Sequence, residues 1–194
     1  MGIGGPLSEL LYTRDYWQPQ NIFGSRIGIE DFLYGFLIGG IACSIYEVVF
    51  RKAFSKNRDR KHRWSHFILP IFAAMFVLLN SLVFVFNMNS IYASILIFIS
   101  FALFALWLRH DLLIASLISG VFVGAVMFVG YLIFLHFYPE AIHRWWFLDN
   151  ISGILVLGVP IEELVWAFSW GMAGGIMYEF FTGLKFIKYR PSVI

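Results

Sequence analysis

The sequence predicts an all-α membrane protein, a bundle of about five transmembrane helices. The first observation is composition: of 194 residues, 60% are hydrophobic and 13% are charged, with a mean hydropathy of +0.77, whereas soluble domains carry roughly 25% charged residues. The second is a series of apolar runs of about 18 residues or more, a length that crosses a bilayer. The third is that the first and last runs share one pattern. A soluble globular fold is therefore excluded.

Five apolar runs are the predicted spans, and they form a single transmembrane domain over residues 27–183. In chain order they are residues 27–50, 67–88, 91–108, 112–137 and 159–182. Backbone amides in hydrocarbon must be satisfied within their own segment, so each run is expected to be a helix. Residues 1–26 lack the basic start and apolar core of a signal peptide and are expected to form an extracytoplasmic N-terminal segment.

The charged residues predict the orientation of the bundle. The loop after the first span, RKAFSKNRDRKHRWSH, is the densest run of Lys and Arg in the chain, and the positive-inside rule places it in the cytoplasm. Counting spans from there puts the N-terminus outside and the tail, residues 184–194, in the cytoplasm of a cell-membrane protein. The net charge of +2 comes mostly from this loop. It reports topology, and no nucleic-acid partner is expected.

The first and last spans echo each other at an offset of 132 residues. The segment IEDFLYGFLIGGIACSIYE, residues 29–47, aligns with IEELVWAFSWGMAGGIMYE, residues 161–179. Glu30 then matches Glu162, and Asp31 matches Glu163. Because four spans separate the two copies, both run from outside to inside, and their carboxylate pairs lie at the same membrane face. We interpret this as a parallel pseudo-repeat.

The acidic residues allow a structural and a functional interpretation. In the structural one, the carboxylates at the start of each copy favour the positive end of a helix, and Glu47 pairs with Arg51 or Lys52 one turn away. We prefer the structural interpretation for Glu47 and Glu179. Apolar or small residues, 152–160, precede Glu162 and Glu163, so this pair is expected below the membrane surface, where ionisable groups are candidates for function.

Two adjacent carboxyls in an apolar setting can act as acid and base. Burial and a like-charged neighbour both favour keeping one proton on the pair near neutral pH, which suits a general acid. Pro160 suits the first turn of the helix that carries them. Aromatic rings near the two pairs can line an apolar pocket and stabilise a cation, although each ring can equally be packing or lipid-facing. The candidate substrate-binding residues are Pro160, Trp166, Phe168, Trp170, Tyr34 and Phe36.

These residues resemble the lycopene cyclase domain of the small integral-membrane type, found in bacteria, archaea and fungi. The resemblance rests on Gly153-Ile154, Pro160-Ile161-Glu162-Glu163, an aromatic residue at Trp166, and Tyr178-Glu179. It covers residues 92–179 as one unit, with residues 17–47 as a partial echo. The family's signature is Pro, any residue, Glu, then Glu or Asp at the start of the last helix of a unit of about three spans.

The resemblance implies an enzyme of the isomerase type, an intramolecular lyase without net redox change. A protonated carboxyl adds a proton to the terminal double bond of a linear carotenoid, the carbocation closes a six-membered ring, and a base removes a proton. Glu162 and Glu163 are the implied acid and base, and Glu30 and Asp31 are the second carboxylate pair. The family requires no flavin, and no cofactor is expected. The expected partners are a long polyene or isoprenoid and the lipid bilayer.

The chain departs from the family pattern in its N-terminal half. Gly28 stands where the signature has Pro160, a single span precedes the second one, and no acidic residue occurs between Asp111 and Glu140. A second chain, in a homo- or hetero-oligomer, is therefore a possible requirement for catalysis. With Cys43 as the only cysteine, no metal site is expected.

Two other function classes stay open from sequence alone. A non-catalytic carotenoid-binding or membrane assembly module would keep the fold and lose the chemistry. A proton-coupled transporter would use the same carboxylates as a relay, but it predicts acids at several membrane depths, and the three middle spans contain none.

Overall fold

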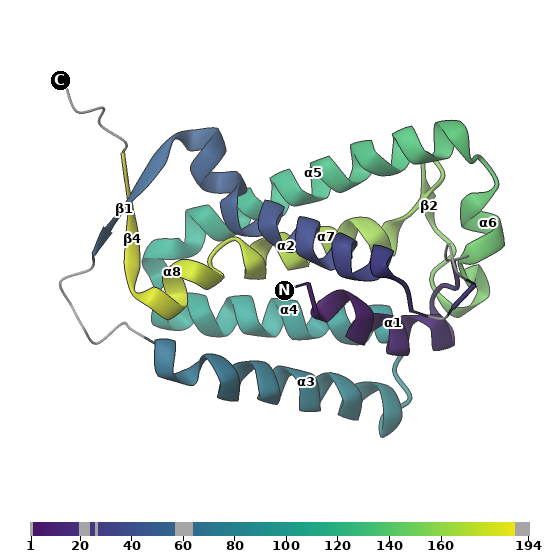
Figure 1. Cartoon of the computed structure of the whole chain (residues 1–194), viewed down its shortest axis with the longest axis horizontal. Helices are drawn as coiled ribbons and strands as arrows, with labels where there is room; N and C mark the ends of the chain where they lie inside the picture. Colours follow the sequence, from purple (N-terminus) through teal and green to yellow (C-terminus); the bar gives the residue numbers. More distant parts are fainter. Residues whose placement is uncertain (1, 20–23, 26, 57–63, 189–194) are drawn as a thin grey trace.

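The computed structural model describes residues 2–19, 24–25, 27–56 and 64–188. Four long helices lie along the long axis of the molecule (Figure 1): α2 (Ile29–Phe50), α3 (Ile68–Phe84), α4 (Ser90–Leu108) and α5 (Leu113–Phe137). Short 3-10 turns, η2 (Ser65–Phe67) and η3 (His110–Leu112), precede α3 and α5. Each of the four is long and apolar enough to cross a membrane. The prediction of an all-α membrane protein is confirmed.

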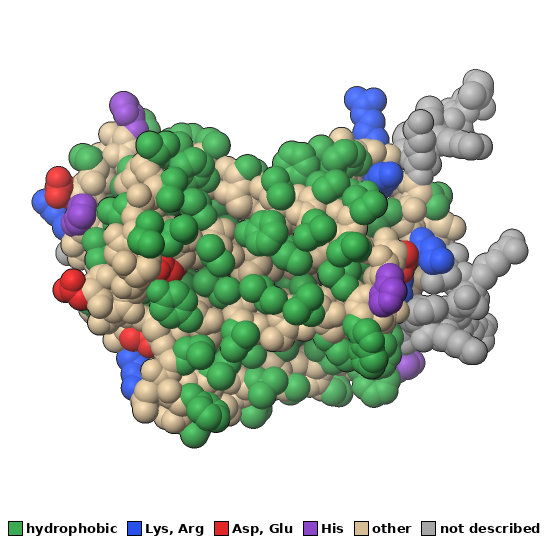
Figure 2. Space-filling model, turned by 180° about the vertical axis from the view of Figure 1, so that it is seen from behind, with side chains coloured by type: hydrophobic (Ala, Val, Ile, Leu, Met, Phe, Trp, Pro, Cys, Tyr) green, Lys and Arg blue, Asp and Glu red, His purple; other side chains and the backbone are tan. Residues whose placement is uncertain are grey.

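The surface agrees with this assignment. Figure 2 shows hydrophobic side chains over the broad middle of one face, while charged side chains gather towards the two ends. Half of the large apolar side chains of α3 are exposed, for example Leu69 at 81%. Such a surface is stable where lipid covers it, because a soluble monomer rarely exposes apolar patches of this extent.

The predicted fifth span, residues 159–182, contains two shorter helices, α7 (Ile161–Gly174) and α8 (Met177–Thr182). The break follows the pair Gly174-Gly175, and glycine is a weak helix former. Gly175 also lies so close to Ser119 of α5 that any side chain there would overlap it. Whether this segment crosses the whole membrane stays a prediction.

The two ends of the bundle are built differently (Figure 1). At one end lie α6 (Ala141–Trp145), η4 (Leu148–Asn150) and a hairpin of β2 (Leu155–Val156) with β3 (Val159–Pro160). At the other end β1 (Lys52–Lys56) pairs antiparallel with β4 (Leu184–Lys188), with Phe54 opposite Phe186. Of the predicted tail, residues 184–194, residues 184–188 form this strand, and residues 189–194 lie outside the described part. Residues 57–63 of the basic loop also lie outside it.

The helix α2 lies beside α7 with residues of the echo at the same level. The Trp170 indole donates to the main-chain oxygen of Ile38 (3.3 Å), and the Cys43 thiol donates to that of Gly174 (3.4 Å). These contacts join positions 132 and 131 residues apart, close to the offset of the sequence echo. The two helices therefore run parallel and in register, while a repeat of whole structural units stays a prediction.

The helix α1 (Gly4–Asp15) is part of the bundle. It packs against α2 and α4 (Figure 1) and buries Glu9, Leu11 and Tyr12. At Gly5 the two backbones meet, since a side chain there would overlap the main-chain oxygen of Asp31. The side of the membrane on which residues 1–26 lie stays a prediction.

The crossing of α1 and α2 yields a test with a matched control. Gly5→Ala forces the backbones of α1 and α2 apart, and we expect it to destabilise the protein by about 1–3 kcal/mol. Gly4→Ala is the control, because a Cβ at Gly4 meets nothing within 4 Å and Ala favours a helix over Gly. Thermal unfolding of both variants in detergent checks this. Equal melting temperatures would contradict the close crossing.

Candidate active site

The head of α7 carries two buried carboxyls. The β2–β3 hairpin turns at Leu157 and Gly158, both with positive φ, and leads directly into Pro160, the N-cap residue of α7. Glu162 and Glu163 lie in the first turn, where the helix dipole favours negative charge. Their exposed fractions are 3% and 6%. Two ionisable groups buried side by side must be satisfied by nearby donors or by protons.

Glu163 receives two donors on a single oxygen. The Tyr16 hydroxyl donates to Oε1 at 2.6 Å, and the Trp146 indole N–H donates to the same atom at 3.0 Å. Tyr16 follows α1, and Trp146 follows α6. Charge-assisted hydrogen bonds of this kind are roughly twice as strong as neutral ones, so the two donors offset part of the cost of burying an ionised Glu163.

Glu162 is satisfied on one oxygen only. Its Oε1 accepts from the Tyr92 hydroxyl of α4 (2.8 Å) and from the backbone N–H of Ser152 (2.9 Å). Its Oε2 is buried and has no hydrogen-bond partner among the described residues. The two neighbouring carboxyls therefore differ. One oxygen of Glu163 accepts hydrogen bonds from two side chains, whereas one buried oxygen of Glu162 has no partner among the described residues.

The second predicted pair, Glu30 and Asp31, lies at the head of α2. Asp31 accepts from the backbone N–H of Gly28 (2.7 Å), which caps the helix. The Glu30 carboxyl lies against Gly28, in space that any side chain at that position would fill. This accounts for glycine at the position equivalent to Pro160. The contact of Asp31 is with its own helix and not with the α7 pair, and a catalytic role for Glu30 and Asp31 stays a prediction.

The predicted substrate-binding rings occupy different environments. Trp166 is buried, donates to the Tyr12 hydroxyl (2.9 Å) and stacks on Trp170 at 6.5 Å between ring centroids. Phe168 lies against Gly120 of α5. On α2, Tyr34 is 43% exposed, with its hydroxyl 3.9 Å from the Met127 sulfur.

Phe36, also on α2, is 61% exposed and stacks on Phe32. Of the predicted rings, Trp166 and Trp170 are therefore buried or part-buried in the cluster that also holds Tyr16 and Trp146. Substrate binding by any of the six residues stays a prediction.

Sequence reasoning missed the residues that hold the two glutamates. Tyr16, Tyr92, Trp146 and Ser152 are 147, 70, 17 and 10 residues from their partners, so no local motif links them. A weak signal exists for α1: Glu9, Tyr12 and Tyr16 recur at helical spacing and share one face. All three are buried, with Glu9 at 5% exposure.

The expectation that Glu47 pairs with Arg51 or Lys52 is wrong. The chain leaves α2 at Arg51 with φ 46°, and the Lys52 ammonium then lies over the Tyr46 ring (5.9 Å). The Glu47 carboxyl instead lies close to the carboxyl of Glu179 of α8, which is completely buried. Neither carboxyl oxygen of Glu179 has a hydrogen-bond partner in the described part of the chain. Two carboxyls in contact require a proton between them.

Arg109, whose side chain is 1% exposed, fixes the same end of the bundle. Its guanidinium donates to the main-chain oxygens of Glu179 (3.2 Å) and Leu184 (2.8 Å) and forms an ion pair with Asp111 (2.8 Å). The cation therefore ties α8 and β4 to the turn between α4 and α5, and its contact with Glu179 is through the main chain.

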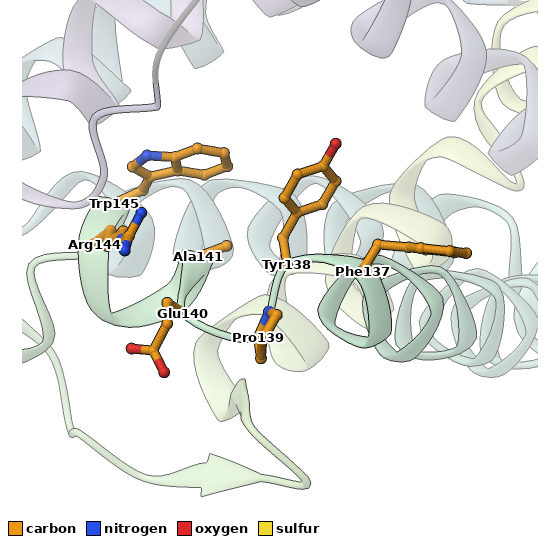
Figure 3. Close-up of a pocket in the computed structure, with 7 residues that line it drawn as sticks. All are labelled: Phe137, Tyr138, Pro139, Glu140, Ala141, Arg144 and Trp145. Atoms are coloured by element: carbon orange, nitrogen blue, oxygen red, sulfur yellow. The ribbon is translucent and has the colours of Figure 1, made fainter.

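A surface pocket lies at the opposite end of the bundle from these residues. It is lined by Phe137, Tyr138, Pro139, Glu140, Ala141, Arg144 and Trp145 (Figure 3), in the turn between α5 and α6. The Glu140 carboxylate points away from the rings of Tyr138 and Trp145. Neither glutamate of α7 lines this pocket, and its aromatic rings suit the headgroup level of a membrane.

Comparison with known proteins decides the family. The lycopene cyclase family model matches residues 6–49 and 89–181. The chain belongs to the lycopene cyclase family. No curated protein and no solved structure gives a significant match. As a lycopene cyclase family member with apolar spanning helices, the protein has a carotenoid cyclase-like function in a membrane.

The match includes every element that contacts the two glutamates of this lycopene cyclase family member. Its first part contains α1 with Tyr16, and its second part contains Tyr92, Trp146 and the head of α7. The unmatched residues 50–88 contain β1 and α3, which carry none of the donors to Glu162 or Glu163 described above. The family relationship therefore covers the site as well as the bundle.

The Glu47–Glu179 contact yields a stability test. In Glu179→Gln the amide can donate to the Glu47 carboxylate, so no shared proton is needed. We expect the variant to be at least as stable as the parent at pH 7 and more stable at alkaline pH, where loss of a proton from the parent would leave two charges close together. Thermal unfolding against pH measures this, with Glu140→Gln as an exposed control. A variant that melts lower than the parent at every pH would contradict the shared proton.

Proposed function

We propose that the protein is an integral membrane carotenoid cyclase that closes a ring at the end group of a linear carotenoid by proton transfer, without net redox change. The observation that supports this best is the difference between the adjacent carboxyls of α7. Glu163 has an oxygen held by two side-chain donors, whereas Glu162 has a buried oxygen with no partner in the described structure. From this difference we infer that Glu163 is the base and Glu162 the acid.

In the proposed mechanism Glu162 is the acid. Its O–H bond breaks as a C–H bond forms at the terminal double bond of the polyene, which leaves a tertiary carbocation and a carboxylate. The electron pair of a nearby double bond in the chain then forms the new C–C bond of a six-membered ring, and the positive charge moves to the ring. No electron enters or leaves the substrate, so the reaction needs no oxidant or reductant.

Glu163 is the proposed base and the counter-charge. An ionised carboxyl in a site of low dielectric stabilises a developing cation strongly, and it can accept the proton that leaves when the ring double bond forms. The proton balance is then restored by transfer from Glu163 to Glu162. The faces of Trp166 and Trp170 add cation–π stabilisation, and the buried position of both acids excludes water that would quench the cation.

Pigment analysis tests this function. Expressed in a host that accumulates lycopene, the protein is expected to produce cyclic carotenoid, and Glu162→Gln is expected to reduce ring formation by about 100-fold or more, because a general acid contributes roughly 10²–10⁴ in rate. Glu163→Gln is expected to cause a loss of similar size. Chromatography of extracted pigments gives the ratio of cyclic to linear product.

Controls separate chemistry from binding and folding. Glu140→Gln removes an exposed carboxyl of the α5–α6 turn and should leave ring formation unchanged. Linear pigment alone, from parent protein shown to be folded and inserted in the membrane, would contradict a cyclase. If the parent and Glu162→Gln then retained equal amounts of linear carotenoid, the non-catalytic binding module would replace it.

A further inference from the structure

We propose that Tyr16 is a positioning residue that stabilises the ionised form of Glu163 and thereby favours Glu162, rather than its neighbour, as the proton donor. The inference deepens the proposed function and rests on it for the catalytic roles. It concerns the residue that directly follows α1, outside the four spanning helices and the motif at the head of α7.

The hydroxyl of Tyr16 is aimed at a single atom. It lies 2.6 Å from Oε1 of Glu163, and the side chain of Tyr16 is 2% exposed. The Trp146 indole reaches the same oxygen at 3.0 Å from another direction. Hydrogen bonds donated to the charged form of a carboxyl favour that form, and two donors on one oxygen hold the negative charge in place.

Tyr16 has little freedom to point elsewhere. Its main-chain oxygen accepts from the N–H of Phe147 (2.9 Å), and the next residue, Trp17, forms a β-bridge to Trp146. One residue earlier, the Asp15 carboxylate accepts from the hydroxyl of Ser90 at the start of α4 (2.5 Å). Backbone contacts therefore hold the segments of Tyr16 and Trp146 together, and both side chains are positioned to donate to Glu163.

Tyr16 stays a donor throughout the pH range of an assay. Burial, and next the negative charge of Glu163, raise the pKa of the Tyr16 hydroxyl well above its usual value of 10. A phenol that cannot ionise always presents its proton to the carboxylate. The other titratable groups that face Glu163 are Glu162 of α7, Tyr131 of α5, Tyr34 of α2 and Tyr12 of α1, with Glu9 of α1 beside the last two.

Tyr12 provides a matched control on the same face of α1. Its hydroxyl is buried one turn before Tyr16, donates to Ser94 (2.9 Å) and accepts from the Trp166 indole (2.9 Å). Tyr12→Phe therefore removes a buried hydroxyl from the same helix without removing a donor to Glu163. Any effect of Tyr16→Phe that Tyr12→Phe does not share reports the bond to Glu163.

The test follows the proton on Glu163 directly. In membranes containing the full chain, infrared difference spectra against pH show the carbonyl band of a protonated carboxyl, and the part lost in Glu163→Gln belongs to Glu163. We expect Tyr16→Phe to move the midpoint of this titration to higher pH by about one unit or more, the equivalent of one hydrogen bond to a charged group. Tyr12→Phe should leave the midpoint where it is.

The outcomes are separable from those of the pigment test. An unchanged midpoint in Tyr16→Phe, or an equal shift in Tyr12→Phe, overturns the inference even if rings form. A shift without ring formation supports the inference about Glu163 and counts against the cyclase.

Where rings form, the acid limb of the pH–rate profile should move with the midpoint in Tyr16→Phe. Should that variant fail to fold, Trp146→Phe removes the second donor from a different element and should move the midpoint in the same direction.

Discussion

The end of the bundle that holds α6, η4 and the β2–β3 hairpin depends on one constraint. Two adjacent carboxyls at the head of α7 are removed from water there. Burying an ionised carboxyl costs several kcal/mol unless donors replace the lost water. Here the donors come from the end of α1, from α4, from the end of α6 and from the backbone at Ser152. Four segments that are distant in the sequence must converge before the first turn of α7 can be buried.

This requirement explains the folding of the connections at that end. A loop between two membrane helices needs only to span the distance between them, yet the segment after α5 forms α6, η4 and the β2–β3 hairpin before α7 begins. The hairpin fixes Pro160 and the start of α7, and α6 delivers Trp146. The helix α1 is held against this assembly by Asn89 and Asn150, whose amides both donate to the main-chain oxygen of Asp15 (3.0 Å each).

Patterns within short stretches of the sequence predicted the features that depend on neighbouring residues, namely the membrane helices and the carboxyl pair. Hydrophobic runs predicted the helices, because a bilayer requires about 20 apolar residues and internal hydrogen bonds. The pair Glu162-Glu163 stood out because it followed an apolar stretch. The partners of the pair could not be predicted, since Tyr16 is 147 residues away from Glu163. The proximity of Glu47 to Glu179 could not be predicted either, because the two residues lie on different helices, α2 and α8.

The α7 pair and the Glu47–Glu179 pair show why burial alone does not identify a catalytic acid. Glu179 is more deeply buried than either glutamate of α7, yet its carboxyl has no hydrogen-bond donor among the described residues and lies beside the carboxyl of Glu47, with which it can share a proton. A proton shared in this way is already engaged in a hydrogen bond and is held between two helices that must stay packed. At the head of α7, Glu163 has two side-chain donors on one oxygen, whereas Oε2 of Glu162 has no partner among the described residues, so we propose Glu162 as the site from which a proton is transferred. The distribution of donors, rather than the degree of burial, therefore separates a carboxyl suited to transfer its proton from one that uses it to hold the fold together.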